Sequence, residues 1–279
     1  MRPARPVAVA VTGVGLVDPR APVLVADDEG FVRGTAAFET TRVYAGRPFR
    51  LAEHLERLVS SARRLALHAP EVAELAGLAD LAVDAGGLPD AVLRVYWTPG
   101  PPGGPPLGLV LVSPLPEGLE EMREAGLRVV SLTWPRRQLG WLLPATKSVS
   151  YATNVAALDE ARRRGADDAV FVDAERIVLE GPVTNVWWRE GTTLLTPAAE
   201  LGILVGETRA AVFELGAELG LEVEEGLYGL DRLLSAEEVF TSSSVREIVP
   251  VVSLDGLPIP RGPAAAELQA ALRRLAGSR

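Results

Sequence analysis

The chain has 279 residues, a net charge of −9 at pH 7 and no cysteine. This length suits two compact lobes, and 48% apolar with 23% charged residues indicates an ordered globular protein. The acidic balance argues against nucleic-acid binding, the lack of cysteine excludes disulfides and thiolate chemistry, and no run is long and apolar enough to span a membrane, so we expect a soluble cytoplasmic protein.

The first part of the chain predicts a strand-rich lobe that carries two helices. Turn signals separate its early apolar runs, and two later segments have apolar residues at helical spacing. The pattern predicts an antiparallel meander over residues 7–45. Two helices follow over 51–65 and 70–85, and then two strands over 91–96 and 107–112. We place the domain boundary within residues 114–126, which gives a smaller N-terminal domain over residues 1–117.

The remaining residues, 118–279, predict a larger C-terminal domain that also mixes strands and helices. The pattern predicts a strand over residues 127–132, a helix over 154–164 and a hairpin formed by 169–173 and 177–188. A second helix is predicted over 208–219, and two more strands over 221–224 and 238–241. The fold class is therefore α+β in two domains.

The basic residues are distributed very unevenly between the two types. Of the 28 lysines and arginines, 27 are arginines and one is a lysine, Lys147. A drift toward arginine explains the loss of surface lysines, but arginine cannot serve as an amine nucleophile because it stays protonated. Either Lys147 survived the drift by chance, or its position needs amine chemistry.

Two segments could bind an anion such as phosphate. Gly206 precedes Glu207 and Thr208 at the start of a predicted helix, where backbone N–H groups and the helix dipole favour negative charge. Ser242, Ser243 and Ser244 add hydroxyl donors at the end of a predicted strand. The alternatives are an ordinary helix start capped by glycine and a solvated turn.

Three charged residues lie next to apolar runs. Glu180 ends such a run before Gly-Pro, so its carboxylate needs a cationic partner unless it is simply solvated. Arg33 and Arg94 lie in apolar strand context, where a guanidinium suits bidentate binding of a carboxylate. Both arginines could instead form structural pairs with acids such as Glu39.

Several common sites are absent from the sequence. His54 and His68 are the only histidines and have no HExxH-type neighbours, so we expect no metal site. Gly13 and Gly15 begin a G-x-G pattern whose third glycine is missing, and no P-loop or G-x-S-x-G motif occurs.

Six ordered segments together resemble the class IV aminotransferases. They read FETTR, EHLERL, TKSVSYATN, LEGPVTNV, GETR and TSSSVREIVPV at residues 38–42, 53–58, 146–154, 179–186, 206–209 and 241–251. The resemblance implies fold type IV, as in D-amino acid aminotransferases, with pyridoxal 5′-phosphate in the interdomain cleft. It also implies a homodimer whose partner subunit helps to line the active site.

The resemblance assigns roles by motif position. Lys147 would be the catalytic residue that forms the Schiff base, Glu180 would meet the pyridine nitrogen, and Tyr151 would lie near the phenolic oxygen. The phosphate would be bound by Arg57, Glu207, Thr208, Ser243 and Ser244. In helical projection Arg57 lies off the apolar stripe, so its length has to carry it to the cofactor.

The choice of substrate depends on residues outside these motifs. The lysine and final motifs are more similar to D-amino acid aminotransferases and 4-amino-4-deoxychorismate lyases than to branched-chain aminotransferases. Residues 98–102 lack the Arg and His expected there in the D-amino acid branch, so we expect Arg33 and Arg94 to bind the substrate carboxylate. We expect a transaminase for D-amino acids or (R)-amines; the lyase, the branched-chain enzyme and a non-catalytic binding protein are the alternatives.

Overall fold

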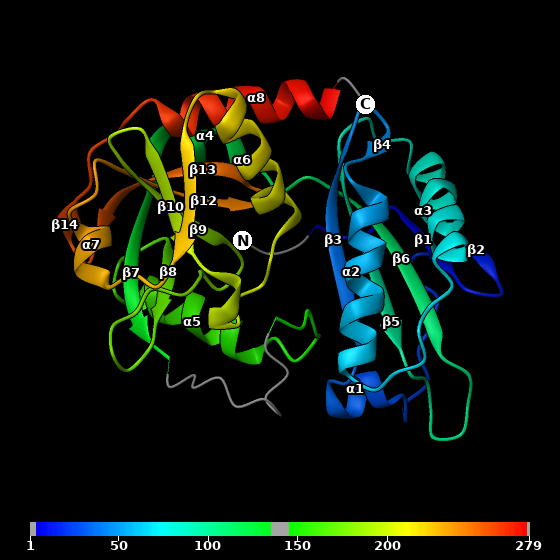
Figure 1. Ribbon diagram of the computed structural model, residues 1–279. Helices are drawn as coiled ribbons and strands as arrows, with labels where there is room; N and C mark the ends of the chain where they lie inside the picture. The colour runs from blue at the N-terminus through cyan, green and yellow to red at the C-terminus, as the bar shows by residue number, and fades with distance from the viewer. Residues whose placement is uncertain (1–3, 135–144, 278–279) are drawn as a thin grey trace. The chain divides into compact units, whose positions relative to one another are not determined.

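The structure is a computed structural model that describes residues 4–134 and 145–277. The chain separates into two compact units, Met1–Glu117 with Thr146–Tyr151 and Gly118–Ala145 with Ala152–Arg279 (Figure 1). The segment around Lys147 thus packs with the first unit, whereas the expected division assigned it to the second domain.

A six-stranded antiparallel sheet forms the first unit, with strand order β2-β1-β6-β5-β3-β4. Its strands are β1 (Ala8–Val11), β2 (Gly15–Val17), β3 (Ala37–Tyr44), β4 (Arg47–Pro48), β5 (Ala91–Thr98) and β6 (Leu107–Pro114). Its helices are α1 (Glu29–Arg33), α2 (Leu51–Arg64) and α3 (Val72–Gly86). Helix α3 is capped at its C-terminus by Gly87, whose positive φ of 60° is a conformation that glycine adopts without strain.

The core of the first unit lies between one sheet face and the helices α2 and α3. Alternate residues point to opposite faces of a strand, so Leu93, Val95 and Trp97 of β5 all face this core. Leu55 and Leu58 of α2 pack against them. The opposite face carries Phe38, Thr40, Arg94 and Tyr96, because these residues have the other parity in the β3–β5 register; we call it the Phe38 face.

The meander expected over residues 7–45 is only partly correct. Strands β1, β2 and β3 form, but a short helix, α1, takes the place of a strand between them. Asp28 caps this helix by accepting hydrogen bonds from the backbone N–H groups of Gly30 and Phe31. An N-cap aspartate stabilises the first turn, which explains why five residues form a helix here.

The second unit is built on an eight-stranded mixed sheet with the order β11-β10-β9-β12-β13-β7-β8 and with β14 paired to β13. Its strands are β7 (Leu127–Thr133), β8 (Asp168–Val172), β9 (Asn185–Glu190), β10 (Thr193–Pro197), β11 (Glu222–Gly226), β12 (Glu238–Ser243), β13 (Glu247–Leu254) and β14 (Leu257–Pro258). The helices are α4 (Leu119–Ala125), α5 (Ala152–Arg163), α6 (Glu207–Glu218), α7 (Leu230–Leu234), α8 (Ala264–Gly277) and a 3-10 turn at Ala199–Leu201.

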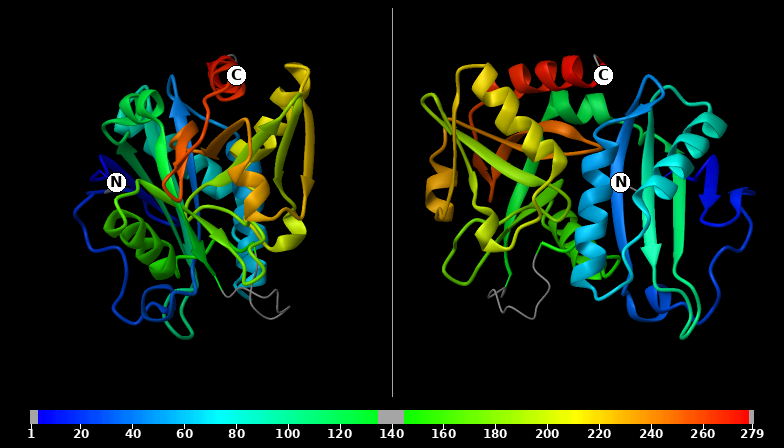
Figure 2. Two further views of the ribbon diagram at one scale, coloured as in Figure 1. Left: turned by 90° about the vertical axis from the view of Figure 1, so that its left-hand side faces the viewer. Right: turned by 45° about the vertical axis from the view of Figure 1, so that its right-hand side comes forward.

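Aliphatic side chains from the strands of this sheet converge on one core beside α7. Helices α4, α6 and α8 pack against β12 and β13 (Figure 2). Among the residues the structure describes, no helix combines the length and the apolar character needed to cross a bilayer.

The hairpin expected over residues 169–173 and 177–188 is also partly correct. Val178 forms a bridge to Val172 of β8, as a hairpin requires. The second arm then breaks at Gly181 and Pro182, and β9 starts only at Asn185, where it pairs with β10 and β12 instead. Proline has no N–H to donate to a ladder, which accounts for the break.

Candidate functional site

The backbone of Lys147 is fixed to the edge of the first sheet. Its carbonyl accepts a hydrogen bond from the Phe38 N–H at 3.0 Å, and the next residue, Ser148, bridges to Ala37. The Lys147 N–H donates to the Ser61 hydroxyl of α2 at 3.2 Å. The only lysine in the sequence is therefore held by β3 and α2 at the first residues of β3.

The amine of Lys147 lies over one ring of a cluster of three aromatic side chains. The Nζ atom lies 4.5 Å from the centroid of the Phe38 ring. Tyr96 stacks on Phe38 at 5.8 Å, and Tyr151 meets the same ring edge-on at 5.5 Å. The amine thus lies on the Phe38 face, and Tyr151 contacts the same ring as the amine.

Arg57 is held by a buried carboxylate rather than extended into solvent. Its Nε and Nη2 atoms each donate to Glu39 at 2.7 Å, and His54 Nδ1 lies 2.7 Å from the same carboxylate. Burial raises the pKa of Glu39, but the bonds from Arg57 and His54 outweigh it and lower the pKa from 4.5 to about 2. The guanidinium therefore faces a permanent negative charge that fixes its orientation.

Arg57 also lies near the lysine segment along the helix. It precedes Ser61 by one turn of α2, and Ser61 accepts the hydrogen bond from Lys147. Its side chain is only 14% exposed. The helical projection placed Arg57 off the apolar stripe but did not identify Glu39 as its partner. Glu39 had been considered only as an alternative partner of Arg33 or Arg94.

The two candidate carboxylate-binding arginines have different surroundings. Arg94 lies on the Phe38 face, half-buried, two residues from Tyr96. Burial raises the pKa of the Tyr96 hydroxyl, and the positive charge of Arg94 partly offsets this rise. Arg33 is in α1 rather than in a strand, its side chain is 72% exposed, and it forms an ion pair with Glu29 at 3.4 Å.

In the second unit, Glu180 follows a buried pair, Val178 and Leu179, as expected. Its Oε2 atom accepts a hydrogen bond from the backbone N–H of Leu204 at 3.0 Å. Leu204 lies two residues before Gly206, the N-cap of α6. The carboxylate and the expected phosphate-binding helix start are thus linked through one residue.

The start of α6 has the expected geometry. The helix begins at Glu207, and Thr208 is buried in its first turn. Backbone N–H groups in a first turn have no intrahelical acceptor, so this end of the helix suits an anion. Ser243 ends β12 and accepts a weak hydrogen bond from the Arg246 N–H at 3.4 Å, and Ser244 follows in the turn. Ser242 instead accepts a bond from the indole of Trp187.

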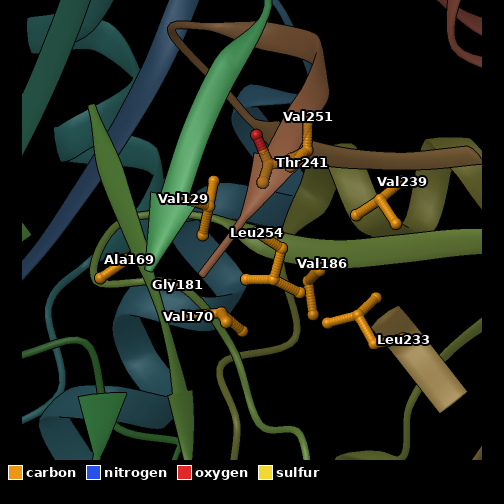
Figure 3. Close-up of a pocket in the computed structure, with 10 residues that line it drawn as sticks. All are labelled: Val129, Ala169, Val170, Gly181, Val186, Leu233, Val239, Thr241, Val251 and Leu254. Atoms are coloured by element: carbon orange, nitrogen blue, oxygen red, sulfur yellow. The ribbon is translucent and has the colours of Figure 1, made fainter. Parts of the chain in front are cut away.

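A pocket in the second unit does not coincide with these residues (Figure 3). The close-up shows aliphatic side chains around it and the hydroxyl of Thr241 as the polar group. Its lining consists of Val129, Ala169, Val170, Gly181, Val186, Leu233, Val239, Thr241, Val251 and Leu254. None of the candidate site residues belongs to this set, so we interpret the pocket as a packing void of the core.

Sequence reasoning missed three residues of the candidate site. Glu39 and Phe38 belong to the first motif, but no role was assigned to them for the site. Asn185, in the glutamate motif, donates to the Leu204 carbonyl at 2.8 Å. The alternation of β3 was the available signal, because it puts Phe38 and Glu39 on opposite faces.

Comparison with known proteins agrees with the motif order. A model of the family described as amino-transferase class IV matches residues 36–254. A bifunctional aminodeoxychorismate lyase / D-amino acid transaminase of Mycobacterium tuberculosis is 33% identical over 266 residues, covering 90% of this chain and 92% of that protein. A putative branched-chain-amino-acid aminotransferase of Methanocaldococcus jannaschii is 33% identical over 240 residues, covering 82% of each.

Solved structures share the fold. A hypothetical aminotransferase from Mycobacterium tuberculosis in a PLP-bound form has a TM-score of 0.90 at 32% identity and covers 98% of this chain and 99% of that one. A fold IV transaminase from Curtobacterium pusillum has a TM-score of 0.88 at 38% identity and covers 96% and 93%. The expected α+β fold type IV is confirmed, and the chain belongs to the class IV aminotransferase family.

Proposed function

We propose that the protein is a pyridoxal 5′-phosphate-dependent transaminase that moves an amino group between a D-amino acid, or an (R)-amine, and a 2-keto acid. The position of the single lysine amine carries this proposal. Lys147 has its backbone fixed by Phe38 and Ser61, and its amine lies against an aromatic ring. A solvated surface lysine would need none of these contacts.

The residues present fit this cofactor chemically. Lys147 offers an amine for the aldehyde, Glu180 a carboxylate for the protonated ring nitrogen, and the start of α6 offers backbone N–H groups for the phosphate. We propose that Arg57, Glu207, Thr208, Ser243 and Ser244 bind the phosphate and that Tyr151 lies near the phenolic oxygen.

When bound, pyridoxal phosphate supplies an aldehyde that condenses with amines and a cationic ring that withdraws electrons from the substrate. The Lys147 amine would hold the cofactor through this aldehyde and, with a substrate amine bound, would move a proton between the substrate α-carbon and C4′ of the cofactor. Glu180 keeps the ring nitrogen protonated, since a carboxylate favours a cationic partner. Glu39 holds the Arg57 guanidinium in one orientation.

Arg94 is our first candidate for binding the substrate carboxylate. Its strand partner Thr40 lies two residues from Phe38, which corresponds to about 7 Å along a strand. The guanidinium therefore belongs to the same sheet face as the Lys147 amine. Arg33 stays a second candidate, with less support, because it is exposed and paired with Glu29.

Two other reactions are supported by the names of relatives. The Mycobacterium tuberculosis relative is called both an aminodeoxychorismate lyase and a D-amino acid transaminase. The Methanocaldococcus jannaschii relative is called a branched-chain aminotransferase. A lyase would release pyruvate and 4-aminobenzoate, and two arginines would suit its dicarboxylate substrate equally well.

We also propose a cytoplasmic homodimer. Helix α1 and the residues before it expose a group of apolar side chains, Leu24, Val25, Phe31 and Val32. Phe31 is 73% exposed, which is costly for an aromatic side chain that stays in water. A second copy of the chain would cover this surface.

A substrate panel tests the proposed reaction. The holoenzyme is incubated separately with D-alanine plus 2-oxoglutarate, L-leucine plus 2-oxoglutarate, (R)-1-phenylethylamine plus pyruvate, and aminodeoxychorismate. We expect the fastest turnover with D-alanine or the (R)-amine. Turnover of L-leucine alone would assign the branched-chain reaction, 4-aminobenzoate release alone would assign the lyase, and no turnover together with no cofactor absorption band would indicate a binding protein.

A further inference from the structure

Three segments of the second unit meet at Asn185, the first residue of β9. Its backbone pairs with Ser242 near the end of β12, next to the serine turn. Its side-chain amide donates through Nδ2 to the Leu204 carbonyl at 2.8 Å. Asn185 is only 6% exposed, so this contact is shielded from water.

The backbone of Leu204 is held from both sides. Its N–H donates to Glu180 Oε2 at 3.0 Å, and its carbonyl accepts from Asn185. The two side chains that hold it, those of Glu180 and Asn185, are five residues apart in the chain. They lie on either side of Gly181 and Pro182, where the segment paired with β8 ends before β9 begins. Because Leu204 precedes Gly206 by two residues, this double contact fixes Glu180 relative to the start of α6.

The same amide explains why residue 206 is glycine. A Cβ atom at Gly206 would lie 2.5 Å from Asn185 Oδ1, while the next nearest atoms belong to Arg209 at 3.7 Å. The backbone of Gly206, with φ −75° and ψ 147°, is one that any residue adopts. The glycine is therefore required by the close approach of Asn185 and not by backbone strain.

We propose that Asn185 is a positioning residue that sets the spacing between Glu180 and the phosphate-binding start of α6. This inference rests on the proposed function, in which Glu180 meets the ring nitrogen and α6 the phosphate. The ring nitrogen and the phosphate belong to one cofactor molecule with a rigid ring. The cofactor therefore sets the distance that has to separate Glu180 from the start of α6. If the protein holds Glu180 and the start of α6 at this distance before the cofactor binds, neither group loses conformational freedom on binding.

The test compares apoprotein binding of pyridoxal phosphate, pyridoxal and inorganic phosphate by absorbance and fluorescence titration. Without Asn185 the two ends of the site are no longer held at the ligand's spacing. For Asn185→Ala we expect affinity for pyridoxal phosphate to fall about tenfold or more, since the Leu204 carbonyl loses the side chain that holds it. Pyridoxal has no phosphate, so its binding should change far less.

Gly206→Ala provides an independent variant in case Asn185→Ala fails to fold. Gly206→Ala should weaken pyridoxal phosphate binding, because its methyl group collides with the Asn185 amide. The double variant Asn185→Ala with Gly206→Ala should bind as Asn185→Ala does, because the colliding atom is gone. Gly229→Ala is the matched control: Gly229 caps α7 with nearly the same backbone, φ −76° and ψ 153°, and has no atom within 4 Å of a Cβ.

Equal losses for pyridoxal and pyridoxal phosphate in Asn185→Ala would overturn the inference, since they indicate a general structural defect. Additive losses in the double variant, or unchanged binding by Gly206→Ala, would overturn it as well. The wild-type protein separates the two proposals. If it fails to bind pyridoxal phosphate at all, the proposed function fails. If it binds, and Asn185→Ala and Gly206→Ala bind as tightly as the wild type, only the role of Asn185 fails.

Discussion

The Nζ atom of Lys147 lies 4.5 Å from the centroid of the Phe38 ring, and the Phe38 N–H donates to the Lys147 carbonyl. One residue thus holds both the backbone and the side chain of the lysine. A cation above an aromatic face is attracted by the ring quadrupole, so the ring restrains the amine on one face of the sheet.

Replacing this ring should slow the capture of pyridoxal phosphate by Lys147. Phe38→Leu keeps an apolar side chain but removes the aromatic face, so the amine samples more positions and we expect a rate lower by on the order of tenfold. Phe38→Tyr keeps the ring and serves as the control. Stopped-flow absorbance after mixing apoprotein with cofactor measures the rate, and equal rates for the leucine and wild-type proteins would contradict the role of the ring.

Glu39 should make the folded state sensitive to acid. Its pKa is depressed in the folded protein, so it contributes stability that is complete above pH 4.5 and is lost as the pH falls toward about 2. The difference between 4.5 and about 2 corresponds to on the order of 3 kcal/mol. Urea unfolding across this pH range measures it.

Glu39→Gln should lose most of this acid-dependent component, because glutamine does not titrate. Glu56→Gln changes an exposed acid on α2, the helix that carries Arg57, and should keep the wild-type pH dependence. A Glu39→Gln protein whose unfolding free energy still fell as steeply as that of the wild type would show that the stability does not come from this carboxylate.

Arg94→Ala should raise KM for D-alanine and D-glutamate by about tenfold or more, because bonds to charged groups contribute about 1.5–3 kcal/mol. Arg94→Lys keeps the charge and should recover part of the loss. Arg33→Ala should have a smaller effect, since Arg33 is exposed and paired with Glu29. Steady-state kinetics with both substrates decide this; unchanged KM in Arg94→Ala and Arg33→Ala would exclude both arginines as carboxylate ligands.

Local patterns predicted several of the long elements of the fold, but no element was expected at α8 or at β13. Helices α2, α3 and α6 differ from their expected bounds by one or two residues. Helix α2 has a strongly periodic apolar face, and glycines mark the end of α3 and the start of α6. Helix α1 was missed because it has only five residues and depends on the Asp28 cap. The strand expected over residues 177–188 was too long, because the prediction ignored that Gly181 and Pro182 interrupt a strand.

In the candidate site, too, residues that stand out in the sequence could be predicted, whereas residues whose role depends on tertiary contacts could not. Lys147 could be identified because it is the only lysine, a property visible in composition alone. The contact between Arg57 and Glu39 could not be predicted, because it joins residues 18 apart on a helix and a strand. Asn185 was likewise invisible, since its role depends on where the chain places Leu204 and Gly206.

The central claim is that Lys147 bonds covalently to pyridoxal phosphate, and reductive trapping tests it directly. The protein is loaded with cofactor, reduced with borohydride, digested and analysed by mass spectrometry. Because the sequence has one lysine, an adduct on the peptide that contains residue 147 identifies the site without ambiguity. We predict one cofactor per chain at Lys147; a reduced protein that carries no adduct there would contradict the account.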